Sequence, residues 1–317
     1  MDKNRKIIIS ILILILLSTV LAIIDIGINM QKSKGKMFQI SMPDLGPGVG
    51  VLKIYGPIHI ANDSNVPFGL SSGSDAVIER LHEMEKDSKI KTIVLRINSP
   101  GGTVAATQEI FERLMKIRKK NIPIVASMGE MAASGGYYIA SACDYILANS
   151  GTITGSIGVI AVSPNLKTLF EKIGIKMNVI KSGKYKDLLS SFRDISSDEK
   201  KLVQQIIDSS YNKFLKDVSL GRNIAIADIK PYADGRIMDG MTAVKCKLID
   251  GIGTFEDAVN KAKELAKLPE DAPIFEDSKS SLERFLISLD GLIKGNFGLI
   301  QRFNYNNFNM IEYRYLP

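Results

Sequence analysis

The sequence indicates an α/β domain with a largely parallel sheet, preceded by one apolar N-terminal segment. Short runs rich in branched residues alternate with longer stretches whose apolar residues recur at helical spacing, which is typical of strands separated by helices. Several of the runs end in glycine-rich turns. The chain has 317 residues, 45% of them hydrophobic, which is enough for one large domain or two modest ones.

The N-terminal segment, residues 7–24, contains 18 positions without a charge. That length is at the short end for spanning a bilayer, where about 20 residues are expected. A signal peptide cleaved near residues 20–22 is the alternative. The short head and the long following domain favour a head that stays in the cytoplasm. We therefore expect a cytoplasmic head (1–6), an uncleaved transmembrane anchor (7–28) in the cell membrane, inner or cytoplasmic, and an extracytoplasmic domain after a tether (29–50).

The first half of the folded domain is expected to begin with a strand at 51–60, which Gly56 and Pro57 bend. Ser74 then caps an amphipathic helix whose apolar stripe begins at Val77. A strand at 93–97 ends in the turn 98–102. The pattern continues with a helix at 104–119 and a strand at 122–127, then with a helix that starts near Ser134 and a strand at 145–148.

The second half is expected to contain a helix at 166–172, a strand at 177–180 and a long helix opened by a capping box of Ser196 and Glu199. The apolar stripe of this long helix should face the core; its members are Leu202, Val203, Ile206, Phe214 and Val218. We place the end of the domain at residue 268 and treat 269–317 as a C-terminal extension. Its aromatic tail could add as a strand to a neighbour's substrate groove, or could be loosely ordered.

Composition excludes some chemistry. The chain has two histidines and two cysteines, all far apart, so a zinc site of Cys and His ligands at short spacing cannot be built; they are His59, His82, Cys143 and Cys246. The two cysteines could pair in an exported domain or be small buried hydrophobes. The densest basic run, 116–120, closes a helix without interleaved aromatics, so no nucleic-acid partner is expected.

One serine has the setting of a nucleophile. Ser134 stands between two alanines and two glycines, after a strand and at the start of an apolar helix. Small neighbours let a substrate backbone approach, and the helix start with the N–H of Gly135 can stabilise an oxyanion. A serine that only caps its helix is the competing interpretation. A second glycine-rich turn, Ser99–Gly102, could point N–H groups into the same cavity or be an ordinary turn.

A base for Ser134 is harder to find. His82 falls on the polar side of a helix and His59 on the first strand, so neither is well placed. A lysine base must be neutral, which near pH 7 requires lowering its pKa by roughly three units from about 10.4, or about 4 kcal/mol. The segment 181–187 follows a predicted strand and contains three lysines; residue patterns alone do not choose among Lys181, Lys184 and Lys186.

Four segments together resemble one family. Residues 98–102, 128–138, 154–159 and 181–187 are similar, in order and spacing, to the signal peptide peptidase A (protease IV) family, over roughly residues 50–268. The resemblance implies the Clp/crotonase-like fold, with repeated β-β-α and β-α units. It places this chain with the short, single-domain, membrane-anchored members.

The resemblance also implies roles for individual residues. Ser134 is expected to be the nucleophile and Lys186 the general base, with Ser156 orienting the lysine. The backbone N–H groups of Gly101 and Gly135 are expected to form the oxyanion hole. Short members assemble into ring-like homo-oligomers in which a neighbouring subunit supplies the lysine, so the active site could be intermolecular.

The expected function is therefore that of a membrane-anchored serine endopeptidase with a Ser-Lys dyad. It would degrade remnant signal peptides or other short apolar peptides at the membrane, and it needs no cofactor or metal. Two alternatives are a crotonase-type acyl-CoA enzyme, which also holds an oxyanion with backbone N–H groups, and a non-catalytic oligomeric membrane scaffold.

Overall fold

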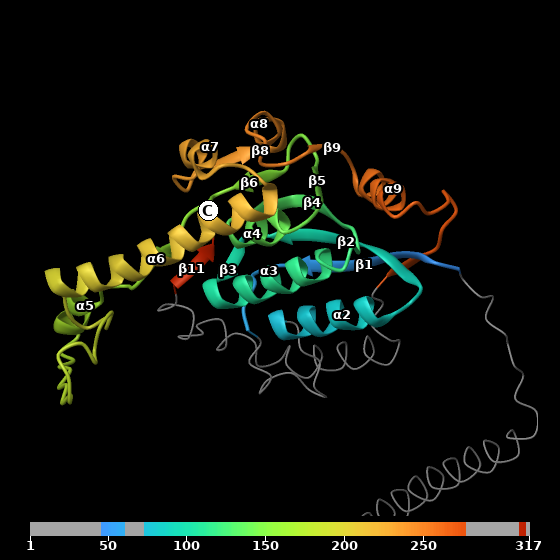
Figure 1. Cartoon of the computed structure of the whole chain (residues 1–317). Coiled ribbons are helices and arrows are strands. Elements are labelled where there is room, and N and C mark those ends of the chain that lie inside the picture. Colours follow the sequence, from blue (N-terminus) through green and yellow to red (C-terminus); the bar gives the residue numbers. More distant parts are fainter. Residues whose placement is uncertain (1–45, 61–72, 277–310, 315–317) are drawn as a thin grey trace, which may run out of the picture. The chain divides into compact units, whose positions relative to one another are not determined.

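The computed structural model describes residues 46–60, 73–276 and 311–314, which form a mixed α/β domain (Figure 1). The strands are β1 (Gly48–Tyr55), β2 (Ile90–Ser99), β3 (Gly101–Thr103), β4 (Ile124–Ala133), β5 (Tyr145–Ala148), β6 (Ile153–Gly155), β7 (Ile160–Ala161), β8 (Ile237–Asp239), β9 (Gly251–Ile252), β10 (Ile274–Glu276) and β11 (Ile311–Arg314). The helices are α2 (Ser74–Lys86), α3 (Val104–Arg118), α4 (Gly135–Ser141), α5 (Lys167–Lys172), α6 (Ser197–Arg222), α7 (Ile226–Ile229), η4 (Lys230–Tyr232), α8 (Gly240–Lys245) and α9 (Phe255–Leu265).

The main sheet is almost entirely parallel, as the alternation of strands and helices predicts. Its order is β10-β1-β2-β4-β5-β9, and all five of these pairings are parallel. The long strand β4 pairs with β5 along its first half and with β6 along its second half. Strand β8 joins the edge of β6 and is antiparallel to it. Strand β4 therefore runs from the middle of the sheet directly to the start of α4.

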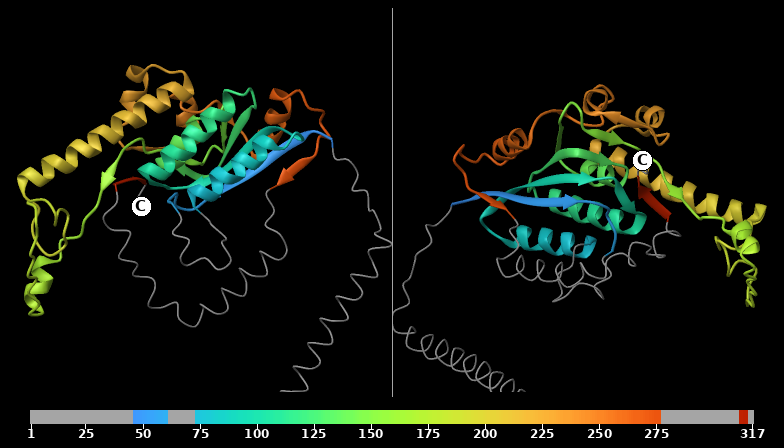
Figure 2. Two further views of the ribbon diagram at one scale, coloured as in Figure 1. Left: turned by 60° about the horizontal axis from the view of Figure 1, so that its bottom comes forward. Right: turned by 180° about the vertical axis from the view of Figure 1, so that it is seen from behind.

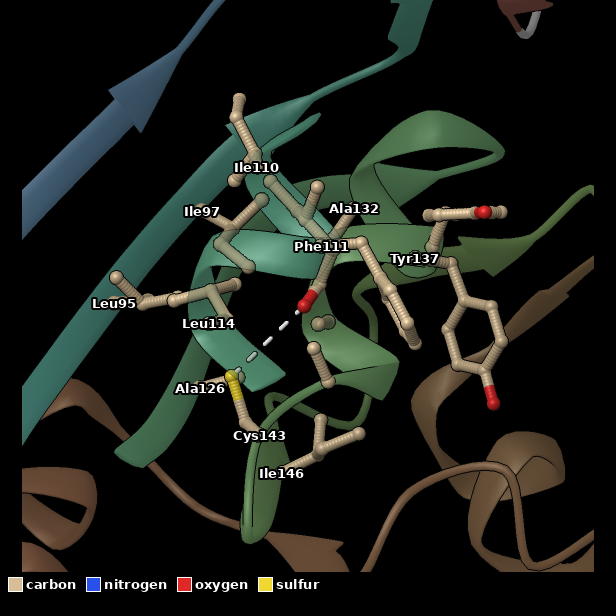
Figure 3. Close-up of a cluster of buried hydrophobic side chains, with 14 of the residues drawn as sticks. Leu95, Ile97, Ile110, Phe111, Leu114, Ala126, Ala132, Tyr137, Cys143 and Ile146 are labelled. Carbon is tan, nitrogen blue, oxygen red and sulfur yellow. Dashed lines mark hydrogen bonds between the residues drawn. The ribbon is translucent and has the colours of Figure 1, made fainter. Parts of the chain in front are cut away.

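Helices cover both faces of this sheet. Since alternate residues of a strand point to opposite sides, one strand supplies side chains to both cores. In β2, Leu95 and Ile97 belong to the larger core, which α2, α3, α4 and α6 cover. Val94 lies on the other face, in a smaller core with Val259 of α9. Figure 3 shows part of the larger core, where side chains of β2, α3, β4 and α4 meet around Cys143.

Both cysteines are free. Cys143 is completely buried in this core and Cys246 is partly buried. Burial raises the pKa of the Cys143 thiol well above its ordinary value. The protonated thiol behaves as a small apolar side chain, which is one of the two interpretations that composition left open.

A second, three-stranded sheet has the order β3-β11-β7. Its middle strand, β11, comes from the C-terminal end of the chain and is antiparallel to both neighbours. It pairs Tyr313 with Gly102 and Ile311 with Ala161. The tail thus adds as a strand, as the sequence suggested, but it pairs with strands of its own chain.

Residues 162–196 form an arm, in which α5 lies beside the first turns of α6 at the end of the domain away from α9 (Figures 1 and 2). The predicted strand at 177–180 is wrong: these residues form no strand and their side chains are exposed. The apolar run that suggested a strand has no sheet edge to pair with in this part of the structure.

Helix α6 connects the arm to the body. The predicted capping box is confirmed, since Ser196 and Glu199 exchange hydrogen bonds at its start. The predicted stripe is only partly correct: Phe214 and Val218 are fully buried, but Ile206 is 43% exposed because the first half of the helix extends beyond the body. Another expectation fails at α2, where Gly73 occupies the N-cap position and Ser74 makes no capping hydrogen bond.

The predicted anchor at 7–28 lies outside the described residues. Within the residues that the structure describes, no helix has both the length and the apolar character needed to cross a bilayer.

Candidate functional site

Ser134 occupies a strained turn between β4 and α4. Its backbone has φ 52° and ψ −114°, a conformation that side-chain-bearing residues rarely adopt. The serine is in the N-cap position, but its side chain makes no capping hydrogen bond. The competing interpretation, a serine that only caps its helix, is therefore wrong. A strained serine at a strand-to-helix turn is the arrangement that exposes a nucleophilic oxygen above the sheet of α/β-hydrolases.

The turn is held by its neighbours rather than by solvent. The Ser134 N–H donates to the carbonyl oxygen of Gly155 (2.8 Å), and the N–H of Tyr138 donates to the Ser134 carbonyl oxygen (2.8 Å). The residue is only 2% exposed. Because both backbone groups are bonded, the surrounding structure can maintain the strained conformation.

Glycines allow two backbone segments to meet beside Ser134. A Cβ atom at Gly135 would come within 3.0 Å of the Gly101 Cα and of the Gly102 N. A Cβ atom at Gly136 would lie 2.7 Å from the Ser99 carbonyl oxygen, and one at Gly102 would lie 1.7 Å from that of Ile58. The two glycine-rich turns predicted from sequence thus lie against each other, and larger residues would separate them.

The N–H groups of the first turn are not equivalent. The Gly101 N–H donates to the Ser99 Oγ atom (3.1 Å). The Gly101 carbonyl accepts from Ile58, and the Thr103 N–H donates to Ile58, so these groups face the chain after β1. Because successive residues of a strand point their backbone groups in opposite directions, the Gly102 N–H faces the opposite edge, where β11 lies. Residue patterns do not distinguish the two adjacent glycines, since their N–H groups differ only in the edge that each faces, and the Gly102 edge is paired with Tyr313 of β11.

Ser156 lies next to Ser134 in space. Strands β4 and β6 pair Ala133 with Gly155, so the two serines follow paired residues of parallel strands. Ser156 also has a positive φ (51°) and is 7% exposed. Its N–H donates to the carbonyl oxygen of Arg236 (2.7 Å). The structure therefore brings four predicted residues together: Gly101, Ser134, Gly135 and Ser156.

Helix α4, which follows Ser134, is anchored to α6. The Tyr138 hydroxyl donates to the buried Asp217 carboxylate, which also accepts from Lys213 Nζ at 2.7 Å. The Tyr138 ring packs edge-on against Phe111 and at a tilt against Phe214, with centroids 5.0 and 4.7 Å apart. These contacts hold α4 in place one turn beyond Ser134.

Lys186 is not with the other site residues. It lies in an irregular segment of the arm and is exposed. Lys181 Nζ is paired with Asp187 (2.6 Å) and Lys184 Nζ with Asp198 (2.7 Å). The Asp198 carboxylate raises the pKa of Lys184, which favours the charged form. Lys186 is the only lysine of the three without an acidic partner among the described residues.

Both histidines of the chain are described, and neither contacts Ser134. His59 Nδ1 lies 3.1 Å from the Pro57 carbonyl oxygen. His82 is beside Arg113 and Glu85, on the exposed side of α2. A Ser-His arrangement is therefore not present in this structure.

Two family models match overlapping parts of this chain. Residues 116–269 match the model of peptidase family S49, and residues 70–153 match that of Clp protease. A Synechocystis protein with a provisional protease name is 46% identical over 202 residues, which cover 64% of this chain and 73% of that protein. A protein of Enterococcus faecium, provisionally named signal peptide peptidase SppA, is 38% identical over 71% of this chain and 65% of its own length.

Protease 4 of Haemophilus influenzae is 34% identical over 69% of this chain, but the match covers only 36% of that longer protein. A chloroplast relative from Arabidopsis thaliana, 32% identical over 70% of this chain and 32% of its own length, is named serine protease SPPA. The resemblance inferred from four short motifs thus extends through the domain, and the chain belongs to peptidase family S49, a family of serine proteases.

Proposed function

We propose that this chain is a membrane-anchored serine endopeptidase with a Ser-Lys dyad. The observation that carries the proposal is the strained turn at Ser134, whose hydroxyl is not used for capping and which lies against the backbone of Gly101 and Gly102. A buried nucleophile beside converging N–H groups is suited to acyl transfer.

In the proposed reaction, the Ser134 Oγ atom attacks a peptide carbonyl while neutral Lys186 accepts its proton, with Ser156 orienting the lysine. The oxyanion is stabilised by the Gly135 N–H and by an N–H of the turn at Gly101. The Lys186 ammonium then protonates the departing amine, and water, deprotonated by the same lysine, hydrolyses the acyl-enzyme.

The second oxyanion donor is open to refinement. Gly101 is the residue that the family resemblance implies, but in this structure its N–H donates to Ser99. The Gly102 N faces the edge that β11 occupies, and it is one of three atoms 3.0 Å from a Cβ built at Gly135. We propose that the Gly102 N–H serves with Gly135 once a substrate strand replaces β11.

The base is proposed to act on a neighbouring subunit. Lys186 is exposed on the arm, and among the described residues it makes no hydrogen bond to Ser134 or Ser156. The arm also exposes a set of large apolar side chains that a second copy could cover; they are Val162, Leu169, Ile173, Ile175, Met177, Val179 and Ile180. Both features are expected of a ring-like homo-oligomer whose sites are completed between subunits.

Peptides are the substrates that this geometry favours. Strand β11 pairs with β3 through Gly102, and this pairing supports the binding of an extended substrate backbone at the same edge. The name of the Enterococcus relative and the apolar N-terminal segment of this chain support signal peptide remnants and other short apolar peptides at the membrane.

The test is labelling of the full-length chain in detergent with a fluorophosphonate probe, followed by mass spectrometry. We expect modification at Ser134 in the wild type, none in Ser134→Ala, and a rate at least about 100-fold lower in Lys186→Ala. Lys184→Ala is the matched control, because its ammonium is two residues away and paired with Asp198; it should label normally.

Two outcomes would contradict the proposal. Labelling that survives loss of Lys186, or that disappears with Lys184, would assign the base elsewhere. A folded oligomer that never labels would favour the non-catalytic scaffold, and saturable binding of a CoA thioester to it would favour the acyl-CoA enzyme.

A further inference from the structure

The most densely bonded polar cluster of the arm surrounds Arg193. Its Nε donates to Asp187 Oδ2 and its Nη2 to Asp187 Oδ1, both at 2.8 Å, so the pairing is bidentate. The same Nη2 also donates to the Asp187 carbonyl oxygen (3.1 Å). On its other side the guanidinium binds both carboxylate oxygens of Glu199, at 2.9 and 2.5 Å.

The acidic partners are shielded although the arm itself is exposed. The side chains of Asp187 and Glu199 are 9% and 4% exposed, and that of Arg193 is 29% exposed. Lys181 completes the cluster by donating to Asp187. The Arg193 guanidinium, helped by Lys181, holds the pKa of Asp187 well below its usual range. It also lowers the pKa of Glu199 to about 2, so both carboxylates are charged at neutral pH.

This cluster lies directly beside Lys186 in the chain. Asp187 directly follows Lys186, in a segment with no regular helix or strand. Local turns link the segment, since the Lys186 N–H donates to Gly183 and the Ser190 N–H to Asp187. Glu199, in contrast, belongs to the capping box of α6. Arg193 therefore connects the irregular residues around Lys186 to the first turn of a 26-residue helix.

We propose that Arg193 is a positioning residue. It binds the carboxylate and the carbonyl oxygen of Asp187 and also binds Glu199, and it thereby fixes the backbone from which Lys186 reaches the nucleophile. The inference rests on the proposed role of Lys186 as base. It applies whether the lysine acts within its own chain or on a neighbour, because every residue of the cluster lies on the arm or in the first turn of α6 of the same chain.

Arginine is needed for its shape as well as its charge. The five N–H groups of a planar guanidinium can bind two carboxylates bidentately and a carbonyl as well, whereas an ammonium has three N–H groups and no planar fork. Arg193→Lys should therefore keep the positive charge but lose the hydrogen bonds that join Asp187 to Glu199. A displacement of about 1 Å at the base costs about 100-fold in rate.

The experiment measures the labelling rate of Ser134 and the kcat and KM for an apolar peptide, against pH, in the full-length oligomer. For Arg193→Lys we expect kcat to fall about 10- to 100-fold with little change in KM. We also expect the acidic limb of the pH profile to move to higher pH. Other titratable groups of this part of the molecule are Lys181, Lys184, Tyr185, Asp187, Asp198 and Glu199, so Lys184→Ala serves as a reference for the profile.

A matched control separates positioning from stability. Ser196→Ala removes a capping hydrogen bond from the same helix start but leaves the arginine fork, so it should lower the melting temperature without moving the pH profile. In a Lys186→Ala background, Arg193→Lys should cause no further loss of labelling, because there is no base left to position.

Three results would overturn the inference. The first is an unchanged pH profile and kcat in Arg193→Lys. The second is a shift of the pH profile in Ser196→Ala that equals the shift in Arg193→Lys. The third is an additive loss of labelling when Arg193→Lys is combined with Lys186→Ala. A fully active Lys186→Ala would instead refute the proposed base itself, and the two failures are thereby distinguished.

Discussion

The two halves of the proposed active site differ in how they are built. Ser134 lies in the body, where β4, β6 and two glycine turns enclose it and leave it 2% exposed. Lys186 lies on the arm, exposed, in a segment without regular structure. The proposed nucleophile is therefore enclosed by a core, whereas the backbone beside the proposed base is held by ionic contacts such as those of Arg193.

Helix α6 contains the same contrast within one element. Its second half buries Phe214 and Val218 in the core, but its first half exposes Ile206 and begins with the charged cap around Glu199. A buried site can be fully formed in one chain. An exposed base needs a partner surface to exclude water, since a lysine in water remains protonated at neutral pH. The contrast is the one expected if the surroundings of Ser134 are complete within one chain and those of Lys186 are completed by a second chain.

The largest effect should come from separating the two halves. Ser134→Ala and Lys186→Ala oligomers should each lose peptidase activity by about 10⁴-fold or more. If the dyad forms between subunits, dissociating and reassembling the two variants together should restore about a quarter of wild-type activity, because half of the intact serines then meet an intact lysine. Activity is followed by peptide hydrolysis. A mixture that stays inactive after verified subunit exchange would place both groups in one chain.

The body should tolerate little change at the turn. Gly135→Ala places a methyl group against Gly101 and Gly102, so we expect about a 100-fold loss of kcat from the displaced oxyanion donors. Gly151→Ala is the matched control, because nothing lies within 4 Å of its added Cβ. Steady-state kinetics and melting curves check both. Equal kinetics for the two variants would mean that the glycine contact does not shape the oxyanion hole.

The arm should respond to acid before the body does. The pKa values of Asp187 and Glu199 are lowered in the folded state, so their contribution to stability is complete at neutral pH. It should be lost as the pH falls from about 4, the ordinary carboxyl range, toward 2. Hydrogen exchange of residues 187–200, corrected for the intrinsic effect of pH, should therefore rise before that of β2.

Asp187→Asn should show the faster arm exchange already at pH 7, where the wild type is protected. Equal protection of the arm and β2 down to pH 2 would show that these ion pairs do not hold the arm.

The smallest effect concerns β11. A chain that ends at residue 310 loses the strand paired with Gly102, which frees the edge beside Ser134. We expect peptide hydrolysis at low substrate concentration to increase by about two- to tenfold, because bound β11 excludes a competing strand. A chain that ends at Arg314 keeps β11 and is the matched control. Lower activity in the shorter chain alone would mean that β11 supports the site instead of covering it.

Much of the body could be predicted from residue patterns. The ends of α3 and β5 fall within one residue of those expected, because branched runs and helical periodicity report burial directly. The capping box at Ser196 could also be predicted from the sequence, since it depends on two residues that are three positions apart. The strand expected at 177–180 failed for the opposite reason: an apolar run reports only that burial would be favourable, and here no neighbouring strand is available.

The sequence by itself determined the family, the nucleophile turn and the set of three lysines, because short motifs carry local backbone requirements such as two adjacent glycines. Only the tertiary structure decided which contacts those residues make: that Gly101 is bonded to Ser99, that Lys181 and Lys184 are paired with carboxylates, and that Arg193 joins Asp187 to Glu199. Such contacts join residues whose separation in the chain follows no period, and their geometry arises only when the arm and the body fold.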